Sequence, residues 1–133
     1  MSRRTYVALG VAFVVLIVAF FWTFDVPTGE PLTDLAAGCV LVTGLFFVLG
    51  GLREEITGGG VRIRWNHLIG IGDFFLAIAM ALNGVDLALT ATETGSQLIA
   101  VLVLFAAVVV AWIGYDFFRG GVYLDLSRYD SEE

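Results

Sequence analysis

The sequence predicts an all-α membrane protein whose four transmembrane helices form one antiparallel bundle. Three observations carry this prediction: 59% of the 133 residues are hydrophobic, the mean hydropathy is +0.91, and the apolar residues are gathered in four long blocks. Such a composition is typical of membrane proteins rather than of soluble domains. Backbone groups in lipid must be hydrogen-bonded within the chain, which favours helices.

Each apolar block is long enough to cross a bilayer. As helices the blocks measure about 27–33 Å, against a hydrocarbon core of about 30 Å. A cleaved signal peptide is the alternative for the first block, but bulky aromatic residues stand where a signal peptide has small ones, so we expect a retained helix. The four predicted helices span residues 6–24, 35–52, 68–89 and 98–118.

The connections between these blocks leave no room for a soluble domain. We therefore expect residues 1–133 to form a single transmembrane domain. Within it, residues 53–66 are predicted to be a cytoplasmic loop and residues 119–133 a cytoplasmic tail.

The basic residues predict how the helices are oriented. All seven are arginines, and they lie before the first block, between the second and third, or after the fourth. The other two connections contain acids and no base. Because cytoplasmic flanks of membrane helices carry the excess of Lys and Arg, we expect a multi-pass protein of the cell membrane with both termini in the cytoplasm.

The overall charge is acidic, with 13 Asp and Glu against 7 Arg, and the chain contains no lysine. This composition resembles that of haloarchaeal proteins, and the chain looks like an uncharacterised small four-helix membrane protein of that group. The resemblance implies surfaces suited to molar salt and no particular activity. This composition argues against a nucleic acid partner, because neutralising phosphates requires a basic patch.

Small residues predict which helix faces pack together, because helices in lipid associate through close backbone approach and interhelical hydrogen bonds. Gly and Ala recur every seven residues in the last three blocks, and Thr5, Ala12 and Ala19 keep this interval in the first. Such a repeat keeps one face in contact when helices supercoil left-handedly, crossing at about +20°. The predicted packing residues are Ala37, Gly44, Gly51, Gly70, Ala77, Ala81, Gly84, Ala100, Ala107 and Gly114.

The loop and the tail each contain a short alternation of apolar and polar residues, at 61–65 and 122–126, which is typical of β-strands. Two hypotheses stay open. The two segments pair as a β-ribbon, with Arg62 or Arg64 facing Asp125, or the loop is irregular and its arginines meet lipid phosphates.

Polar residues interrupt the outer half of the third block. Asp86 lies about one turn from the outer end, so we expect it to reach solvent. Asn83 lies deeper, and interhelical hydrogen bonds in membranes are worth about 0.6–2 kcal/mol, so a structural contact is predicted. Its candidate partners are Thr43, Cys39 and Thr23.

Asp73 is the acid that lies deepest in an apolar block, about 8 Å along the helix from the inner edge. An ionised carboxylate at that depth costs several kcal/mol unless it is paired or protonated. Candidate partners that reach in from the inner interface are Arg119, Arg53 and Tyr115, and another subunit is the alternative. Two roles stay open: a buried ion pair with Arg119, or a proton or cation relay. The candidate polar site therefore consists of Asp73, Asn83 and Arg119.

The remaining residues indicate no enzyme. With one histidine, His67, and one cysteine, Cys39, a single chain can form neither a bis-histidine haem site nor a disulfide. No catalytic carboxylate pair, activated nucleophile or metalloprotease motif occurs, so no cofactor or metal is expected.

The function predicted from the sequence is a non-enzymatic accessory or interaction subunit in the lipid bilayer. Its expected partner is a second copy or another membrane protein. The alternative is a small proton- or cation-coupled transporter or channel that works as an oligomer, with Asp73 as the titrating group.

Overall fold

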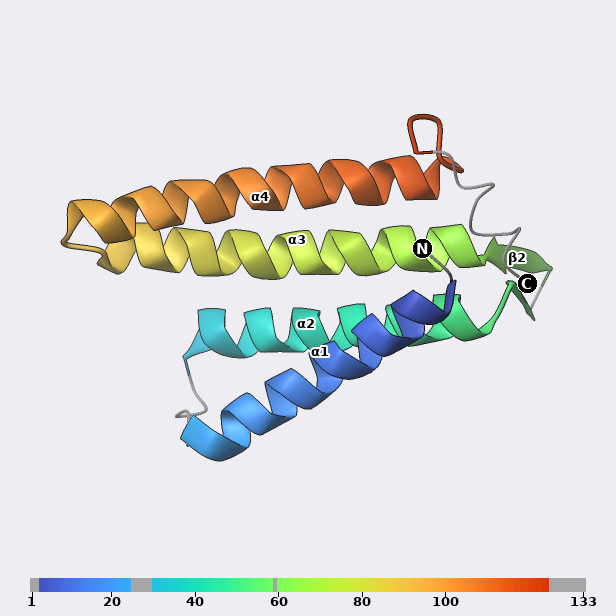
Figure 1. The fold of residues 1–133 in the computed structure, drawn as a ribbon, viewed down its shortest axis with the longest axis horizontal. Coiled ribbons are helices and arrows are strands. Elements are labelled where there is room, and N and C mark those ends of the chain that lie inside the picture. Colours follow the sequence, from blue (N-terminus) through green and yellow to red (C-terminus); the bar gives the residue numbers. More distant parts are fainter. Residues whose placement is uncertain (1–2, 25–29, 59, 125–133) are drawn as a thin grey trace.

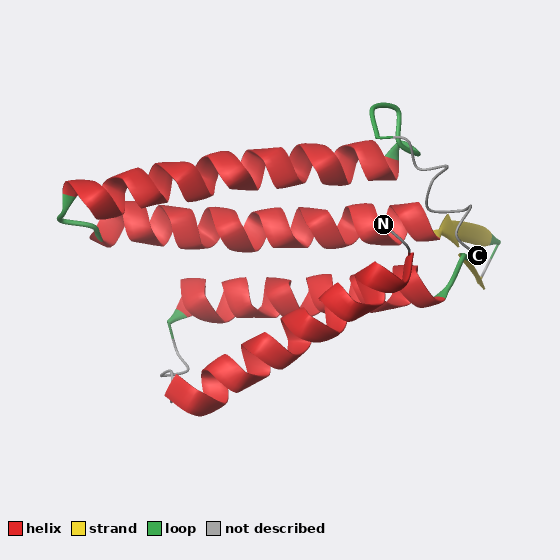
Figure 2. Cartoon of the chain, in the orientation of Figure 1, coloured by secondary structure: helices red, strands yellow, loops and turns green. Residues whose placement is uncertain are grey.

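The computed structural model describes residues 3–24, 30–58 and 60–124. All four of its helices are long and apolar enough to cross a membrane, which confirms the predicted helical class (Figure 1). A short β-hairpin is the other regular element (Figure 2). In chain order the elements are α1 (Arg3–Phe24), α2 (Pro31–Leu52), β1 (Glu55–Gly58), β2 (Val61–Arg64), α3 (Trp65–Thr90) and α4 (Thr94–Phe118).

Each helix begins about one turn before the apolar block that predicted it. α2 starts with Pro31, and α4 starts with Thr94 directly after Glu93. The first backbone N–H groups of a helix have no acceptor within it, so proline and polar residues are tolerated there. Hydropathy marks the apolar part of each helix, and the helix itself extends further.

Three helices lie side by side in the order α2, α3, α4, each antiparallel to the next, and α1 runs obliquely across α2 (Figure 1). Within the described residues, the extended helix interfaces are those of α1 with α2, α2 with α3, and α3 with α4. α1 and α4 therefore diverge along most of their length.

The described arginines all lie at one end of the molecule. We call the end where α1 and α3 begin and α2 and α4 end the basic end (Figure 1). Its exposed arginines among the described residues are Arg4, Arg53, Arg62, Arg64 and Arg119. We call the opposite end the acidic end, where the described acids are Glu30, Asp34, Asp86 and Glu93.

The β-hairpin corrects the predicted ribbon. β2 pairs antiparallel with β1, in a register that places Ile56 opposite Ile63, and the described tail residues 122–124 form no strand. Arg62 contacts Glu55 diagonally across the hairpin, with 3.7 Å between Nε and Oε1, while Arg64 stands directly opposite Glu55. A pairing between near neighbours costs less chain entropy than one with a distant tail, so the local hairpin prevails. The predicted partner Asp125 lies outside the described residues.

An aromatic cluster joins all four helices near the basic end. The Tyr6 ring of α1 meets Phe47 of α2 edge to face at 5.6 Å between centroids, and meets Phe117 of α4 at 6.0 Å. Trp65 of α3 meets Phe117 at 6.2 Å, and Ile69 is fully buried beside them. Edge-to-face pairs are each worth about 0.5–1.5 kcal/mol beyond the area that they bury. In this cluster α1 and α4 meet through the Tyr6 and Phe117 rings.

Glycines set the closest approaches between helices. A Cβ added at Gly70 of α3 would lie 2.6 Å from the Gly114 carbonyl oxygen of α4. A Cβ added at Gly10 of α1 would lie 2.5 Å from the Gly44 carbonyl oxygen of α2. The prediction for the first helix was therefore wrong: Ala12 and Ala19 are exposed, and Gly10 makes the contact instead.

We predict that Gly114→Ala destabilises the fold by about 1–3 kcal/mol, because the new methyl group overpacks the interface between α3 and α4. It would lie 2.7 Å from the Cβ of Asp73 and 2.9 Å from the Gly70 carbonyl oxygen, neither of which is the end of a flexible side chain. The measurement is the free energy of unfolding in detergent, followed by circular dichroism.

The matched control is Gly38→Ala in α2, because a Cβ at Gly38 would meet no atom within 4 Å. This variant should be neutral or more stable by up to about 1 kcal/mol, since alanine favours a helix over glycine. Equal effects of the two substitutions would show that the α3–α4 approach is not a tight contact.

Candidate functional site

Asp73 lies in the basic half of α3, on the flank next to α4. It is 8% exposed, and its Cβ packs against the backbone of Gly114. Among the residues that the structure describes, none donates a hydrogen bond to its carboxylate or forms an ion pair with it. The Asp73 side chain is therefore largely buried and receives no donor from the described part of its chain.

The predicted partners of Asp73 are engaged elsewhere. The Arg119 guanidinium lies 5.4 Å from the centroid of the Tyr115 ring, in a cation–π arrangement on the exposed side of α4. Arg53 is exposed at the C-terminal end of α2. Neither arginine forms an ion pair with Asp73 in the described part of the chain, so the structure does not bring Asp73 and Arg119 together.

Asn83 is also separate from Asp73, about 15 Å further along α3. Its side-chain Nδ2 donates to the Ala79 carbonyl oxygen of its own helix at 3.0 Å. The polar contact between α2 and α3 comes instead from Thr43, whose buried Oγ1 lies 3.0 Å from the Gly72 carbonyl oxygen and 2.9 Å from that of Cys39. The three residues of the predicted polar site thus occupy three different surroundings.

Asn66 makes a polar contact that the sequence analysis missed. It is buried in the first turn of α3, and its Nδ2 donates to the Phe117 carbonyl oxygen at the end of α4 at 2.9 Å. The last carbonyl groups of a helix lack the usual intrahelical donor, and the Phe117 oxygen accepts this bond together with one from the Gly120 N–H at 3.0 Å. The Asn66 Oδ1 is buried and has no partner in the described chain. The available signal was an amide at the start of one helix of an antiparallel pair, opposite the end of the other.

Asp116 organises the chain that follows α4. It is 2% exposed, and its Oδ2 accepts a hydrogen bond from the Leu124 backbone N–H at 2.8 Å, while its Oδ1 accepts from that of Tyr123 at 3.1 Å. The helix ends in a Schellman motif: Gly121 N–H donates to the Asp116 carbonyl oxygen, and Gly120 has a φ of 89°. Tyr123 then packs on Trp112, with ring centroids 5.5 Å apart.

The predicted packing residues divide by helix. Most of those in α3 and α4 are buried, and Ala81 of α3 is half-buried. In α2, Ala37 and Gly51 are half-buried. Gly44 of α2 faces α1. Gly50, which precedes Gly51 and is not part of the seven-residue interval, packs against Ile69 of α3. The buried members are Gly44, Gly70, Ala77, Gly84, Ala100, Ala107 and Gly114.

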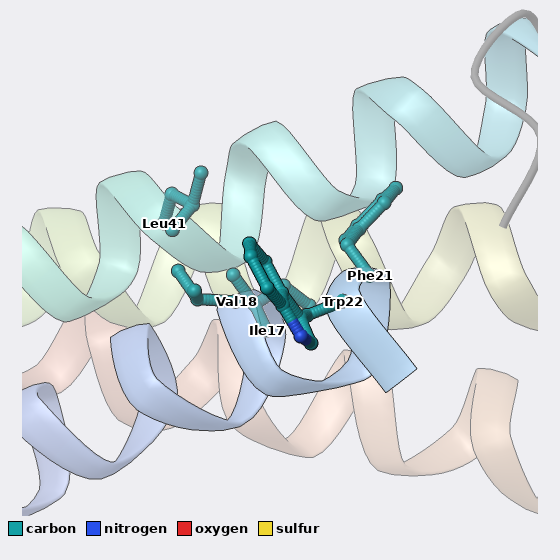
Figure 3. Close-up of a pocket in the computed structure, with 5 residues that line it drawn as sticks. All are labelled: Ile17, Val18, Phe21, Trp22 and Leu41. Atoms are coloured by element: carbon teal, nitrogen blue, oxygen red, sulfur yellow. The ribbon is translucent and has the colours of Figure 1, made fainter. Parts of the chain in front are cut away.

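The surface grooves of the described chain offer little polar chemistry. One groove of about 410 Å³ lies between α1 and α2, lined by Ile17, Val18, Phe21, Trp22 and Leu41 (Figure 3). Its Trp22 side chain is 88% exposed. Within the described residues no three His, Cys, Asp or Glu side chains lie close enough to hold a metal ion. Such a groove suits apolar chains better than a reacting substrate.

The fold and these sites define a helical protein with four helices long and apolar enough to cross a membrane. The chain belongs to DUF7994, a family of unknown function whose model matches residues 1–130. No curated protein and no solved structure matches the chain.

We predict that Asn66→Ala lowers the free energy of unfolding by about 0.5–1.5 kcal/mol, because it removes a buried hydrogen bond to the Phe117 carbonyl oxygen, which keeps only the Gly120 N–H as donor. Asn83→Ala is the matched control, since its amide bonds only to its own helix among the described residues and its side chain is exposed. The measurement is chemical unfolding in detergent. A larger effect at position 83 than at position 66 would contradict the prediction.

We predict that Asp116→Ala frees the segment after α4, because the Tyr123 and Leu124 N–H groups lose their acceptor. Hydrogen bonds to a charged group are worth about 1.5–3 kcal/mol, so amide protection at these two positions should fall at least tenfold. Hydrogen exchange with mass spectrometry measures it. Asp86→Ala should leave this segment unchanged, and retained protection in Asp116→Ala would refute the role of the carboxylate.

Proposed function

We propose that this chain is a membrane protein that crosses the cell membrane four times, with its basic end in the cytoplasm. The arginines at the basic end support this orientation, because the positive-inside rule assigns such flanks to the cytoplasm. Exposed leucine, valine and phenylalanine side chains along α1 and α4 support contact with lipid. Both termini are then cytoplasmic, and the seven-residue repeat supports left-handed crossings.

The proposed role is that of a non-enzymatic interaction subunit, working with a second copy or with another membrane protein. Asp73 is the observation that carries this proposal. It follows Ile69 by one helical turn, so the two side chains share a flank of α3. Ile69 is covered by the aromatic cluster that includes Tyr6 of α1. Beyond this cluster α1 and α4 form no extended interface among the described residues, and Asp73 packs against Gly114 of α4.

A hydrogen-bond donor from a partner helix would offset the free-energy cost of placing the Asp73 carboxylate in an apolar setting. A carboxylate in an apolar setting is costly unless it is paired, hydrogen-bonded or protonated, and its own described chain supplies no donor. A partner helix that packs beside α3 and α4 near Gly114 would bring such a donor to the 8% of Asp73 that stays exposed. The acidic net charge of −6 argues against nucleic acid as the partner.

The second candidate function is coupled transport of protons or cations by an oligomer. The same observation favours it, because an unpaired acid in an apolar helix is a common site of proton relay. The two candidates differ in what Asp73 contributes: assembly in the first, and charge movement in the second.

We predict that Asp73→Asn dissociates the assembly of the full-length protein when it is extracted gently from its own membrane at high salt. Removing one partner of a buried pair costs about 3–5 kcal/mol, which is enough to lower the assembled fraction strongly. Native mass spectrometry gives the masses, and Asp86→Asn is the control, since Asp86 is a partly exposed acid near the other end of the same helix.

The outcomes separate the two candidates. A bare monomer for the unsubstituted chain would overturn the interaction subunit. Assembly that survives Asp73→Asn while ion flux in liposomes is lost would support transport. Unchanged assembly together with unchanged flux would remove Asp73 from both roles.

A further inference from the structure

A second apolar groove lies between α3 and α4, on the side of these helices that faces away from α1. Its volume is about 370 Å³. The helical period places Phe74 and Ile78 on the flank of α3 opposite Ile69, and Ile69 packs with the Tyr6 cluster. Residues that line the groove include Phe74, Ile78 and Ala81 of α3 and Leu104, Val108 and Ala111 of α4.

Alanines give this groove its depth. Ala77 of α3 and Ala107 of α4 line it and are buried, and Ala81 and Ala111 are half-buried beside them. All the lining residues are apolar, so the groove offers contact to an apolar occupant and no hydrogen bond from a side chain.

The groove is short enough to lie within one leaflet of a bilayer. Its lining from Ala111 to Leu104 extends about 10 Å along α4, and half of the hydrocarbon core is about 15 Å. At the far end Leu104 packs across onto Gly84, whose added Cβ would lie 2.8 Å from the Leu104 Cγ, and this contact closes the groove. An occupant that follows the whole span, as a transmembrane helix does, would meet this closure near the middle of its path.

The open end of the groove carries positive charge. Tyr115 and Phe118 continue the groove face of α4 by one and two turns beyond Ala111. The His67 ring of α3 meets Phe118 edge to face at 5.0 Å, and the exposed Arg119 guanidinium lies 5.4 Å from the Tyr115 ring centroid. No carboxylate in the described part of the chain pairs with Arg119. A guanidinium held in this way is suited to a phosphate oxygen.

We propose that this groove holds one hydrocarbon chain of a phosphate-headed lipid from the leaflet at the basic end, with the lipid phosphate on Arg119. The inference rests on the proposed insertion into a membrane and is independent of the proposed subunit role. Within a bilayer, packing rather than the hydrophobic effect retains such a chain, so the shape of the groove and the charge at its mouth together select the lipid.

The test uses the delipidated full-length protein in detergent, titrated with dioleoyl phosphatidylglycerol or with dioleoylglycerol, which lacks the phosphate. Native mass spectrometry counts the lipids that each chain retains. We expect one phosphatidylglycerol molecule to be retained at the lowest lipid concentrations, and dioleoylglycerol to be retained more weakly. Equal retention of the two lipids would overturn the role of Arg119.

Two pairs of variants locate the site. Ala111→Phe fills the groove and should abolish retention of the first lipid, whereas Ala12→Phe, at an exposed alanine of α1, should not. Arg119→Gln should weaken retention of phosphatidylglycerol about fivefold, as expected for one basic residue near an anionic headgroup, and Arg4→Gln should leave it unchanged.

Three results would overturn the proposal in distinguishable ways. Equal lipid retention by Ala111→Phe and the unsubstituted chain would remove the lipid from the groove. A dimer that Ala111→Phe converts to a monomer would assign the groove to a second copy. Recovery of the native chain from cells without detergent would overturn the membrane insertion on which the inference rests.

Discussion

The contact between Gly70 and Gly114 is the constraint on which the arrangement of α3 and α4 depends. Neither residue has a side chain to separate the helices, so each backbone lies against the other. Close approach of this kind is typical of helices that pack in lipid. Because the two helices are this near at the basic end, the Asn66 amide reaches the Phe117 carbonyl group and Phe117 joins the aromatic cluster.

The same contact gives Asp73 its surroundings. A glycine opposite Asp73 brings the backbone of α4 close to its Cβ and supplies no side chain that can pair with it. Asp116 presents the opposite case, because its carboxylate is buried but accepts backbone N–H groups from the segment that follows α4. The two acids lie on neighbouring helices near the same end and differ in whether local backbone supplies a donor. This difference is why Asp73, and not Asp116, is the candidate for a functional role.

The sequence was sufficient for the features that depend on local composition. Hydropathy located all four helices, and the seven-residue interval included Gly70, Gly84 and Gly114, whose positions meet α4 or α3 closely in the structure. The sequence did not predict contacts that depend on which residue of a neighbouring helix lies opposite. Gly10 contacts α2 because of the oblique path of α1, which periodicity within one helix does not encode.

Polar contacts were the least predictable part of the structure. Asn66 and Asp116 stand close to helix ends, where polar residues are common and usually solvated. Their burial depends on the end of the neighbouring helix and on the turn at Gly120, which are tertiary features. Arg119 illustrates the same difficulty, since charge alone favoured the distant Asp73 and the structure directs its guanidinium to the adjacent Tyr115 ring.

The β-hairpin limits how the helices can move relative to one another. Two residues separate the end of α2 from β1, α3 begins directly after β2, and the Trp65 N–H donates to the Glu54 carbonyl oxygen at 2.9 Å. The end of α2 and the start of α3 are thus clamped by a closed, hydrogen-bonded connection, while at the other end they have no such link. Any opening between these two helices must therefore pivot at the basic end, and the largest displacements must fall at the acidic end.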